Sequence, residues 1–407
     1  MKNLIILLFV LEFLLSNPLQ EAIDNAKNGD IIELGSGVIN GDVVISKPVS
    51  IIGNSTVING SGTSSVIKIF SNNVILKNLK IQNSGNSHSN IDAGISCEQS
   101  NNILIENNEI QNSLFGIDFK QCNDSKILNN RISSKDVDLG LRGDAIRLWH
   151  SHNNKILNNK INKSRDLVIW YSSGNLIKSN IATDGRYSLH FMYAGRNLVE
   201  NNVFLRNSVG VFFMFSNGSE VRYNFIAHST GTFGVGIGMK DTSDFLVEDN
   251  ILMYNARGLY LDNSPYEPGT TNRYFKNQIL YNTTAIQLQS VQLPSIFKDN
   301  NFIGNIDLVL SASSEKSLHK NNWINNFYDE YEGFDRDKDG FGDNAFKNYA
   351  YADIIWQNYP NLKFFYASAA ISSINFLSKL APFSEPILLL KDNQPRIKPM
   401  EMEFKYE

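Results

Sequence analysis

The sequence predicts an all-β chain folded as a right-handed parallel β-helix, a solenoid of about ten or more coils. The first observation behind this prediction is an asparagine that recurs about every 22 residues, with loop insertions of four to seven residues in a few coils. Stacked strands lie about 4.8 Å apart, so equivalent amides in successive coils can hydrogen-bond to one another. We place this asparagine at a bend, where it can adopt the left-handed backbone. The recurring residues are Asn108, Asn130, Asn159, Asn180, Asn202, Asn224, Asn250, Asn277, Asn300 and Asn321.

The second observation is a strand whose alternate residues are apolar in every coil. Side chains that point inward in this way stack into columns, and each coil is then stable only against its neighbours. The hand of the solenoid follows from fold analogy. The first inward column reads Ile95, Ile117, Ile146, Val168, Leu189, Val211, Ile237, Leu259, Ile286 and Leu308, and the second reads Cys97, Phe119, Leu148, Trp170, Phe191, Phe213, Met239, Leu261, Leu288 and Leu310.

Five segments follow one another along the chain. Residues 1–17 have one lysine and a short apolar run, which is typical of a secretory signal peptide and too short to span a bilayer. Residues 18–60 predict a capping helix and the first strands, and such a cap covers strand edges that would otherwise pair with other chains. Residues 61–330 form the β-helix and 331–350 an acidic segment. Residues 351–407 hold a helix with apolar spacing over 361–380 and a polar tail.

Composition narrows the range of partners. The net charge is -4 and the sequence has no basic run, so nucleic acid is not an expected partner. The two cysteines, Cys97 and Cys122, are too few for a disulfide framework. They could form a single bridge in an oxidising compartment, or serve as two small thiols in the core.

The outward columns carry an unusual set of side chains in the middle of the solenoid. Aligned as above, Trp149, Tyr171, Met192 and Met214 share one outward column, beside Ile169, His190 and Phe212. Such a patch is larger than a monomer normally exposes. Thioethers and an imidazole select Cu(I), so His190, Met192 and Met214 are candidate ligands for copper that is bound transiently. Alternatively, these methionines pack under a loop or against a partner.

A second candidate metal site is the acidic run Asp335, Asp337, Asp339, Asp343, which includes Gly340. Carboxylates two residues apart can surround a hard cation, with the glycine allowing a sharp turn, so we expect calcium to organise this loop. Phe346 stands where an EF-hand would have its glutamate. The alternative is an acidic turn without metal. His150 and His152 are expected to be turn residues.

The sequence does not favour an enzyme. Parallel β-helices often cleave acidic polysaccharides with clustered carboxylates and a basic partner. In the predicted alignment Asp118 lies beside Arg147, but no stacked acid cluster with a basic partner emerges. A carbohydrate-active β-helix, either a lyase or a glycan-binding protein, remains the alternative.

Several motifs resemble those of the NosD family. They include G-R-Y-S-L-H-F-M-Y at 185–193, V-G-V-F-F-M-F-S at 209–216 and the closing acidic run. The resemblance implies a periplasmic, non-enzymatic accessory subunit of an ABC-type complex, which is needed to assemble the copper–sulfur site of nitrous-oxide reductase.

The same resemblance implies partners. They are an ABC permease with its ATPase, a copper chaperone lipoprotein and nitrous-oxide reductase itself, so that the chain contacts the membrane only through partners. Docking is then expected at two places, the outward patch and the C-terminal helix. The residues are Trp149, Tyr171 and Phe212 on the patch and Phe364, Ile371, Ile374 and Leu377 on the helix.

Overall fold

A computed structural model describes residues 17–290, 293–312, 318, 320–350, 360–365, 368–380 and 386–401. These residues form two compact units, one up to Val203 and one from Phe204 onward. Both are built from stacked parallel strands, so the fold is the right-handed parallel β-helix that the repeat predicts. Strand β21 (Val203–Leu205) lies where the first unit passes into the second along the chain.

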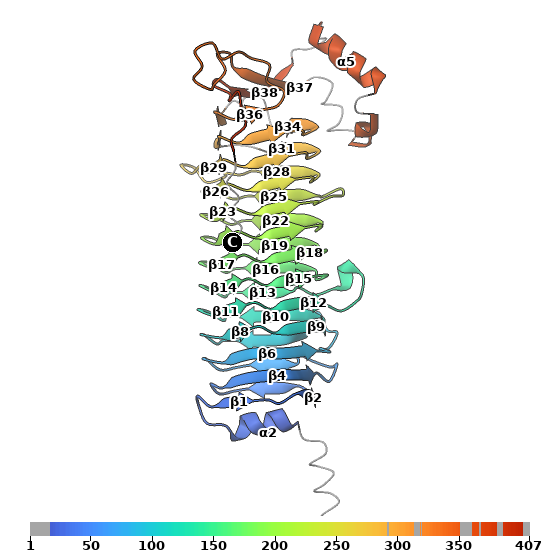
Figure 1. The fold of residues 1–407 in the computed structure, drawn as a ribbon, viewed down its shortest axis with the longest axis vertical. Helices are drawn as coiled ribbons and strands as arrows, with labels where there is room; N and C mark the ends of the chain where they lie inside the picture. The colour runs from blue at the N-terminus through green and yellow to red at the C-terminus, as the bar shows by residue number, and fades with distance from the viewer. Residues whose placement is uncertain are drawn as a thin grey trace, which may run out of the picture. The chain divides into compact units, whose positions relative to one another are not determined.

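In the first unit the coils contribute strands to three columns, visible as stacked arrows in Figure 1. Column 1 contains β3 (Val43–Ile45), β5 (Ile67–Ile69), β7 (Ala93–Glu98), β10 (Phe115–Lys120), β13 (Ile146–Trp149), β16 (Asp166–Trp170) and β19 (Tyr187–Met192). Columns 2 and 3 begin with β1 (Ile31–Glu33) and β2 (Gly37–Asn40) and share β4 (Ser50–Asn59) and β6 (Ile75–Gln82). Column 2 continues with β8 (Leu104–Glu106), β11 (Lys126–Leu128), β14 (Lys155–Leu157), β17 (Leu176–Lys178) and β20 (Leu198–Glu200), and column 3 with β9 (Glu109–Ser113), β12 (Arg131–Ser134), β15 (Lys160–Asn162) and β18 (Ile181–Thr183).

The second unit repeats this arrangement. Column 1 contains β22 (Val209–Met214), β25 (Val235–Lys240), β28 (Arg257–Asp262), β31 (Thr284–Gln289) and β34 (Asp307–Ser311). Column 2 contains β23 (Glu220–Arg222), β26 (Leu246–Glu248), β29 (Asn272–Phe275), β32 (Ser295–Lys298) and β35 (Asn322–Ile324). Column 3 contains β24 (Phe225–Ala227), β27 (Ile251–Met253), β30 (Gln278–Leu280), β33 (Asn301–Ile303) and β36 (Phe327–Tyr328).

The asparagine ladder is present in both units. In the first unit the Nδ2 of Asn159 donates to the Oδ1 of Asn180 at 3.0 Å, and the Oδ1 of Asn159 accepts from both the backbone N and the Nδ2 of Asn130. The ladder amides are buried, and the left-handed residue is the one before each of them, such as Asn158 at φ 56°. The predicted left-handed conformation of the ladder asparagine itself is therefore wrong. In the second unit Asn300 pairs with Asn326 rather than the expected Asn321.

The predicted inward columns are wrong by one residue in two coils. Trp170, expected in the core, has Trp149 and Met192 as its Cα partners and therefore lies in the outward column. Tyr171, expected in that column, lies at the following corner with φ 50°. The run from Leu167 to Trp170 is apolar throughout, so it carries no alternation that could fix the register. In β34 the same shift turns Leu310 outward, opposite Gln287.

The described part of the first unit begins with a capping helix, as predicted. Helix α2 (Pro18–Asn25) starts after Asn17, whose side chain accepts hydrogen bonds from the backbone N–H groups of Leu19 and Gln20. Leu19 and Ile23 are buried. Strands β1 and β2 pair in parallel with β4 of the next coil and therefore belong to the solenoid. Within the described part of this end, the cap consists of α2 alone. Residues 1–16, most of the expected signal peptide, lie outside the described residues.

The C-terminal segment differs from the expected helix and polar tail. A 3₁₀ helix, η2 (Pro360–Phe365), and helix α5 (Ala369–Leu380) replace a single helix over 361–380. Within the expected tail, β38 (Ile387–Asp392) pairs antiparallel with β37 (Phe346–Ala350). The Oδ2 of Asp392 accepts from the backbone N and the Nδ2 of Asn326, so a carboxylate closes the amide ladder. A further 3₁₀ turn, η1 (Leu139–Leu141), lies in the first unit.

Replacing a ladder amide should destabilise the first unit. Asn159→Ala removes the side chain that accepts from Asn130 and donates to Asn180 and to the carbonyl of Ile127, leaving buried polar groups without partners. Each such group costs about 1–3 kcal/mol, so we expect the urea midpoint to fall clearly. The control Asn28→Ala changes an exposed asparagine and should leave the midpoint in place. Equal midpoints for the two variants would contradict the role given to the ladder.

Candidate functional site

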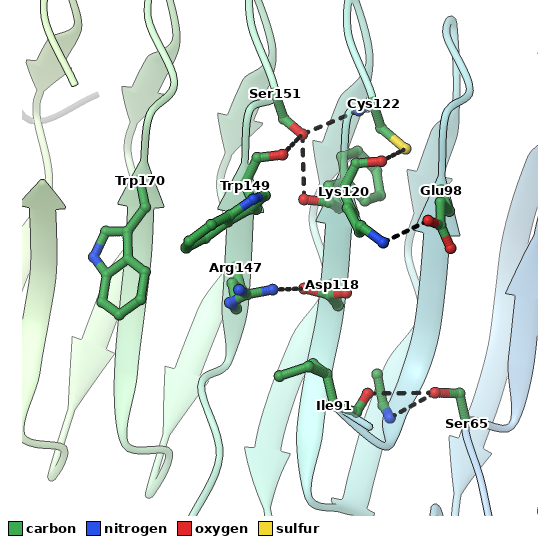
Figure 2. Close-up of polar contacts among 12 residues, drawn as sticks. Ser65, Ile91, Glu98, Asp118, Lys120, Cys122, Arg147, Trp149, Ser151 and Trp170 are labelled. Carbon is green, nitrogen blue, oxygen red and sulfur yellow. Dashed lines mark hydrogen bonds and ion pairs between the residues drawn. The ribbon is translucent and has the colours of Figure 1, made fainter. Parts of the chain in front are cut away.

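The candidate site is the outer face of column 1 in the first unit, between β10 and β19. Figure 2 shows the part of it that contains Asp118, Trp149 and Trp170. Trp149, Trp170 and Met192 occupy equivalent positions at the ends of β13, β16 and β19. The two indole rings meet edge to face with centroids 5.8 Å apart, and Arg147 lies 4.9 Å from the centre of the Trp149 ring. Stacked strands thus set two tryptophans and a methionine in one row along the solenoid.

His190 lies two residues before Met192 on the same outward side of β19, yet only 8% of it is exposed. Its ring stacks on Tyr187 at 4.8 Å and meets the edge of Trp170 at 5.8 Å. Neither ring nitrogen has a hydrogen-bond partner among the described residues, and the same is true of the Trp170 Nε1. Burial lowers the pKa of His190 to about 4, so the imidazole is neutral at physiological pH.

Three carboxylates flank these rings, each paired with an arginine of the following coil. Asp118 accepts from Arg147 at 2.8 Å, as Figure 2 shows. Asp144 accepts from the Nε of Arg165 at 3.1 Å. Asp166 accepts from the guanidinium of Arg186 and from the backbone N of Tyr187. The expectation that no stacked acid cluster with basic partners would emerge is therefore wrong. Alignment found Asp118 and Arg147, but the residues of the other pairs lie just before a strand or at its first residue, where the alternating pattern gives no register.

Burial and the neighbouring charges shift the pKa values of two of these carboxyl groups. Burial, and next to it the charge of Asp166, raises the pKa of Asp144 to about 7, although Arg165 counteracts both. Burial also raises the pKa of Asp118, against the lowering effect of Arg147. The carboxyl of Asp144 consequently changes its charge near neutral pH.

The corner after column 1 carries a stack of rings. Tyr171 lies between His150 and Tyr193 with ring centroids 4.9 and 5.1 Å away, and all three residues have a positive φ. His150 was expected to be a turn residue, and it is one, but its ring is stacked. His152 accepts a hydrogen bond from the backbone N of Ser173 through Nδ1. Tyr171 therefore belongs to this corner stack beside the candidate site.

The remaining candidates of the outward patch lie in the second unit. Met214 ends β22 opposite Lys240. Phe212 lies opposite Gly238 and so close to it that a Cβ on the glycine would come within 2.3 Å of the ring. The missing side chain at Gly238 is thus what makes room for Phe212.

The acidic loop brings three of its four predicted carboxylates together. One oxygen each from Asp335, Asp337 and Asp339 lie within 4.8 Å of one another. Asp335 also accepts from the backbone N–H groups of Asp339 and Gly340, and Gly340 has φ 90°. Asp343 accepts from the backbone N of Arg336 instead and is not part of the group of three.

Three of the four apolar residues that were predicted to dock at the C-terminal segment are exposed. Phe364 is 88% exposed, and Ile374 and Leu377 on α5 are about half exposed. The backbone of Ile371 is part of α5. Within the described ranges, no helix is both long enough and apolar enough to cross a membrane.

Comparison with known proteins agrees with the motifs. The family model described as "Periplasmic copper-binding protein (NosD)" matches residues 128–333, which is 206 of the 407 residues. The chain belongs to the NosD family. A Pseudomonas aeruginosa protein named "Probable ABC transporter binding protein NosD" is 25% identical to it over 184 residues, covering 42% of this chain and 41% of the relative. The chain thus matches about two fifths of that relative's length.

Solved structures similar to this NosD-family chain show the fold alone. The A-module of a mannuronan C-5 epimerase from Azotobacter vinelandii has a TM-score of 0.57 at 13% identity, covering 75% of this chain and 93% of the module. The catalytic domain of an α-1,3-glucanase has a TM-score of 0.52 at 15% identity, covering 74% of this chain and 64% of the domain.

The raised pKa of Asp144 predicts an inverse dependence of stability on pH. Because the folded carboxyl keeps its proton up to about pH 7, whereas an unfolded one loses it near pH 3.8, the contribution of this group to stability falls as pH rises through that window. His190, with its lowered pKa, acts in the opposite direction between pH 6.5 and 4. The wild type must therefore be compared with Asp144→Asn, which can still accept from Arg165.

We expect the difference in unfolding free energy, variant minus wild type, to increase between pH 5 and pH 8. Chemical unfolding at several pH values measures it, with Asp124→Asn as the control because Asp124 is exposed. A difference for Asp144→Asn that stays flat with pH would show that the carboxyl does not titrate in this range.

Proposed function

We propose that this chain is a periplasmic accessory subunit of an ABC-type transporter complex, which relays copper or docks partners during assembly of the copper–sulfur site of nitrous-oxide reductase. The family description, with its terms "periplasmic" and "copper-binding", supports this proposal, as does the name of the P. aeruginosa relative. In this role the chain is not an enzyme. It is exported by its N-terminal signal and works with a permease, its ATPase, a copper chaperone lipoprotein and the reductase.

The observation that carries the proposal is the unpartnered ring of His190. A neutral imidazole always has one N–H donor and one free nitrogen lone pair. Burying such groups without partners costs about 1–3 kcal/mol each, a cost that a phenylalanine would avoid. The described residues provide no partner for either nitrogen. A lone pair without a hydrogen-bond donor can accept a metal ion, and because both ring nitrogens are buried, the side chains that cover them have to move to admit it.

The neighbours of His190 favour Cu(I) over harder ions. The thioether of Met192 is a soft ligand, and with an imidazole it selects Cu(I). Trp170 stands beside Met192 in the row and touches His190, and an indole face attracts cations. Met214, the third predicted ligand, lies in the second unit, so the proposal is built on His190 and Met192. Copper here is cargo that the chain passes on.

The same face suits protein docking. Trp149 and Tyr171 of the first unit are both partly exposed, and their rings meet edge to face. In the second unit, Phe212 offers a partly exposed aromatic surface of its own. We propose that the chaperone or the reductase docks on the row of Trp149, Trp170 and Met192 when copper is exchanged. We assign contact with the permease to η2 and α5. Phe364 of η2 and Ile374 and Leu377 of α5 are exposed, and Ile371 also belongs to α5. Exposed aromatic anchors of this kind are the usual centres of interfaces.

Anaerobic titration with Cu(I) against a competing chelator tests the copper proposal. We expect the wild type to bind about one ion and Met192→Leu, which keeps the volume but removes the sulfur, to bind at least about tenfold more weakly, or about 1.4 kcal/mol. Because His190 is already neutral, with its pKa near 4, affinity should stay constant from pH 8 to pH 6.

The matched control is Met253→Leu, which alters another partly exposed methionine at the end of a strand. Met214→Leu reports whether the second unit contributes a ligand. If the wild type binds no Cu(I), or if Met192→Leu binds as tightly as the wild type, the relay at His190 and Met192 is ruled out. The exposed row would then serve docking alone.

For the acidic loop we propose that calcium binds Asp335, Asp337 and Asp339. Three carboxylates that face one another repel, and a bound cation removes this repulsion. Added Ca²⁺ should raise the melting temperature, EDTA should reverse the rise, and Asp337→Asn should abolish it. Glu332→Gln, which changes an exposed acid nearby, should respond like the wild type. A melting temperature indifferent to Ca²⁺ in the wild type would argue for an acidic turn without metal.

One observation favours the carbohydrate-active alternative. Asp144, with a pKa near 7, lies beside a second buried carboxylate, Asp166, and such pairs can divide acid and base roles. Against this, Arg165 and Arg186 already engage both carboxylates. The two functions separate in one assay, because an enzyme would change acidic polysaccharides by itself, whereas an accessory subunit requires its partners.

A further inference from the structure

The two cysteines of the chain meet in the interior of the first unit. Cys97 lies on β7 in the inward column, and Cys122 lies just after β10 in the next coil. Their sulfur atoms are 2.6 Å apart, and both side chains are fully buried. The 25 residues that separate them along the chain correspond to one coil. Stacking of adjacent coils is thus what brings them together.

Cys122 occupies a position that neighbouring coils give to serine. Ser100, Ser151 and Ser172 each follow a left-handed corner residue and donate to the carbonyl two residues back, at 2.8, 3.1 and 2.7 Å. The Cys122 sulfur makes the corresponding contact to Lys120 at 3.5 Å. A thiol is a weak donor, so the cysteine gives up the hydrogen bond that a serine would make. Cysteine replaces serine in the one of these corners that lies against Cys97.

We propose that Cys97 and Cys122 form an intramolecular disulfide that staples these two coils. Each thiol loses its hydrogen as the sulfur–sulfur bond forms. Two electrons and two protons pass to the disulfide of a thiol oxidoreductase, which is reduced to its dithiol. Neither sulfur is accessible in the folded chain, so the exchange takes place before the coils have closed over the pair.

The proposed disulfide lies next to strands of the candidate site. Cys122 follows β10, the strand of Asp118, and its backbone N donates to Ser151 just beyond the Trp149 strand. The bridge therefore anchors the coil that contains Asp118, at the end of the candidate site where the Asp118–Arg147 pair lies. If the chain relays copper as proposed, the bridge also removes two thiolates, which would retain Cu(I) more tightly than a thioether and an imidazole do.

Counting thiols tests the proposal without any copper measurement. The full chain, exported to the periplasm, is denatured in N-ethylmaleimide without reductant and weighed by mass spectrometry. We expect no adduct on the wild type, two adducts after reduction, and one unreduced adduct on Cys122→Ser, a substitution that matches the serine of the neighbouring corners. Digestion without reduction should yield one peptide pair joined through Cys97 and Cys122.

Two adducts on the unreduced wild type would overturn the proposal, and so would a disulfide joining two chains. Refolding the reduced protein in a glutathione redox buffer separates this question from export, because the bridge should form there as well. A bridge without Cu(I) binding would leave the staple established and the copper relay refuted. Cu(I) binding with two free thiols would do the reverse.

Discussion

The structure depends on the register between successive coils, and buried amides fix that register. Where two asparagines are adjacent in the ladder, the later one accepts from the backbone N–H and the side-chain amide of the earlier one and donates to a carbonyl of another coil, as Asn159 does with Asn130 and Ile127. A shift of one residue between two coils would break the ladder hydrogen bonds that join them, and each buried amide group left without a partner costs about 1–3 kcal/mol. Loops of different length can therefore be inserted at the corners while the strands stay aligned.

This register decides which side chains become neighbours on the outside. Residues at equivalent positions meet across coils, so an acid in one coil can reach an arginine in the next. The first unit uses this repeatedly, from Asp118 with Arg147 to Asp166 with Arg186. Buried ion pairs gain little stability over apolar packing, since desolvation offsets the attraction. Their effect here is to set the orientation of the guanidinium groups, one of which lies over Trp149.

The fold could be predicted from the sequence, but which residues make up the candidate site could not be predicted in full. A spaced asparagine is a local signal that survives loop insertions, and it placed nearly every coil. The outward row needs the phase of each strand, and that phase is lost where Leu167 to Trp170 are all apolar. Trp170 was missed for this reason. Asp144 and Arg165 were missed because corner residues follow no alternating pattern. The closing strand β38 is separated from its partner by more than 30 residues, and no periodicity reveals such a pairing.

His190 shows how a regular scaffold creates a buried polar group without a hydrogen-bond partner among the described residues. On an isolated strand the ring would be solvated and would titrate near its ordinary pKa of 6.5. Stacking places Tyr187 and Trp170 against it, so the ring loses water without gaining a partner among the described residues. The same burial lowers its pKa and keeps the imidazole in the form that binds metals. The scaffold thus bears a cost in stability at this position, and in the copper relay that we propose this unsatisfied ring is the ligand that accepts the ion and releases it again.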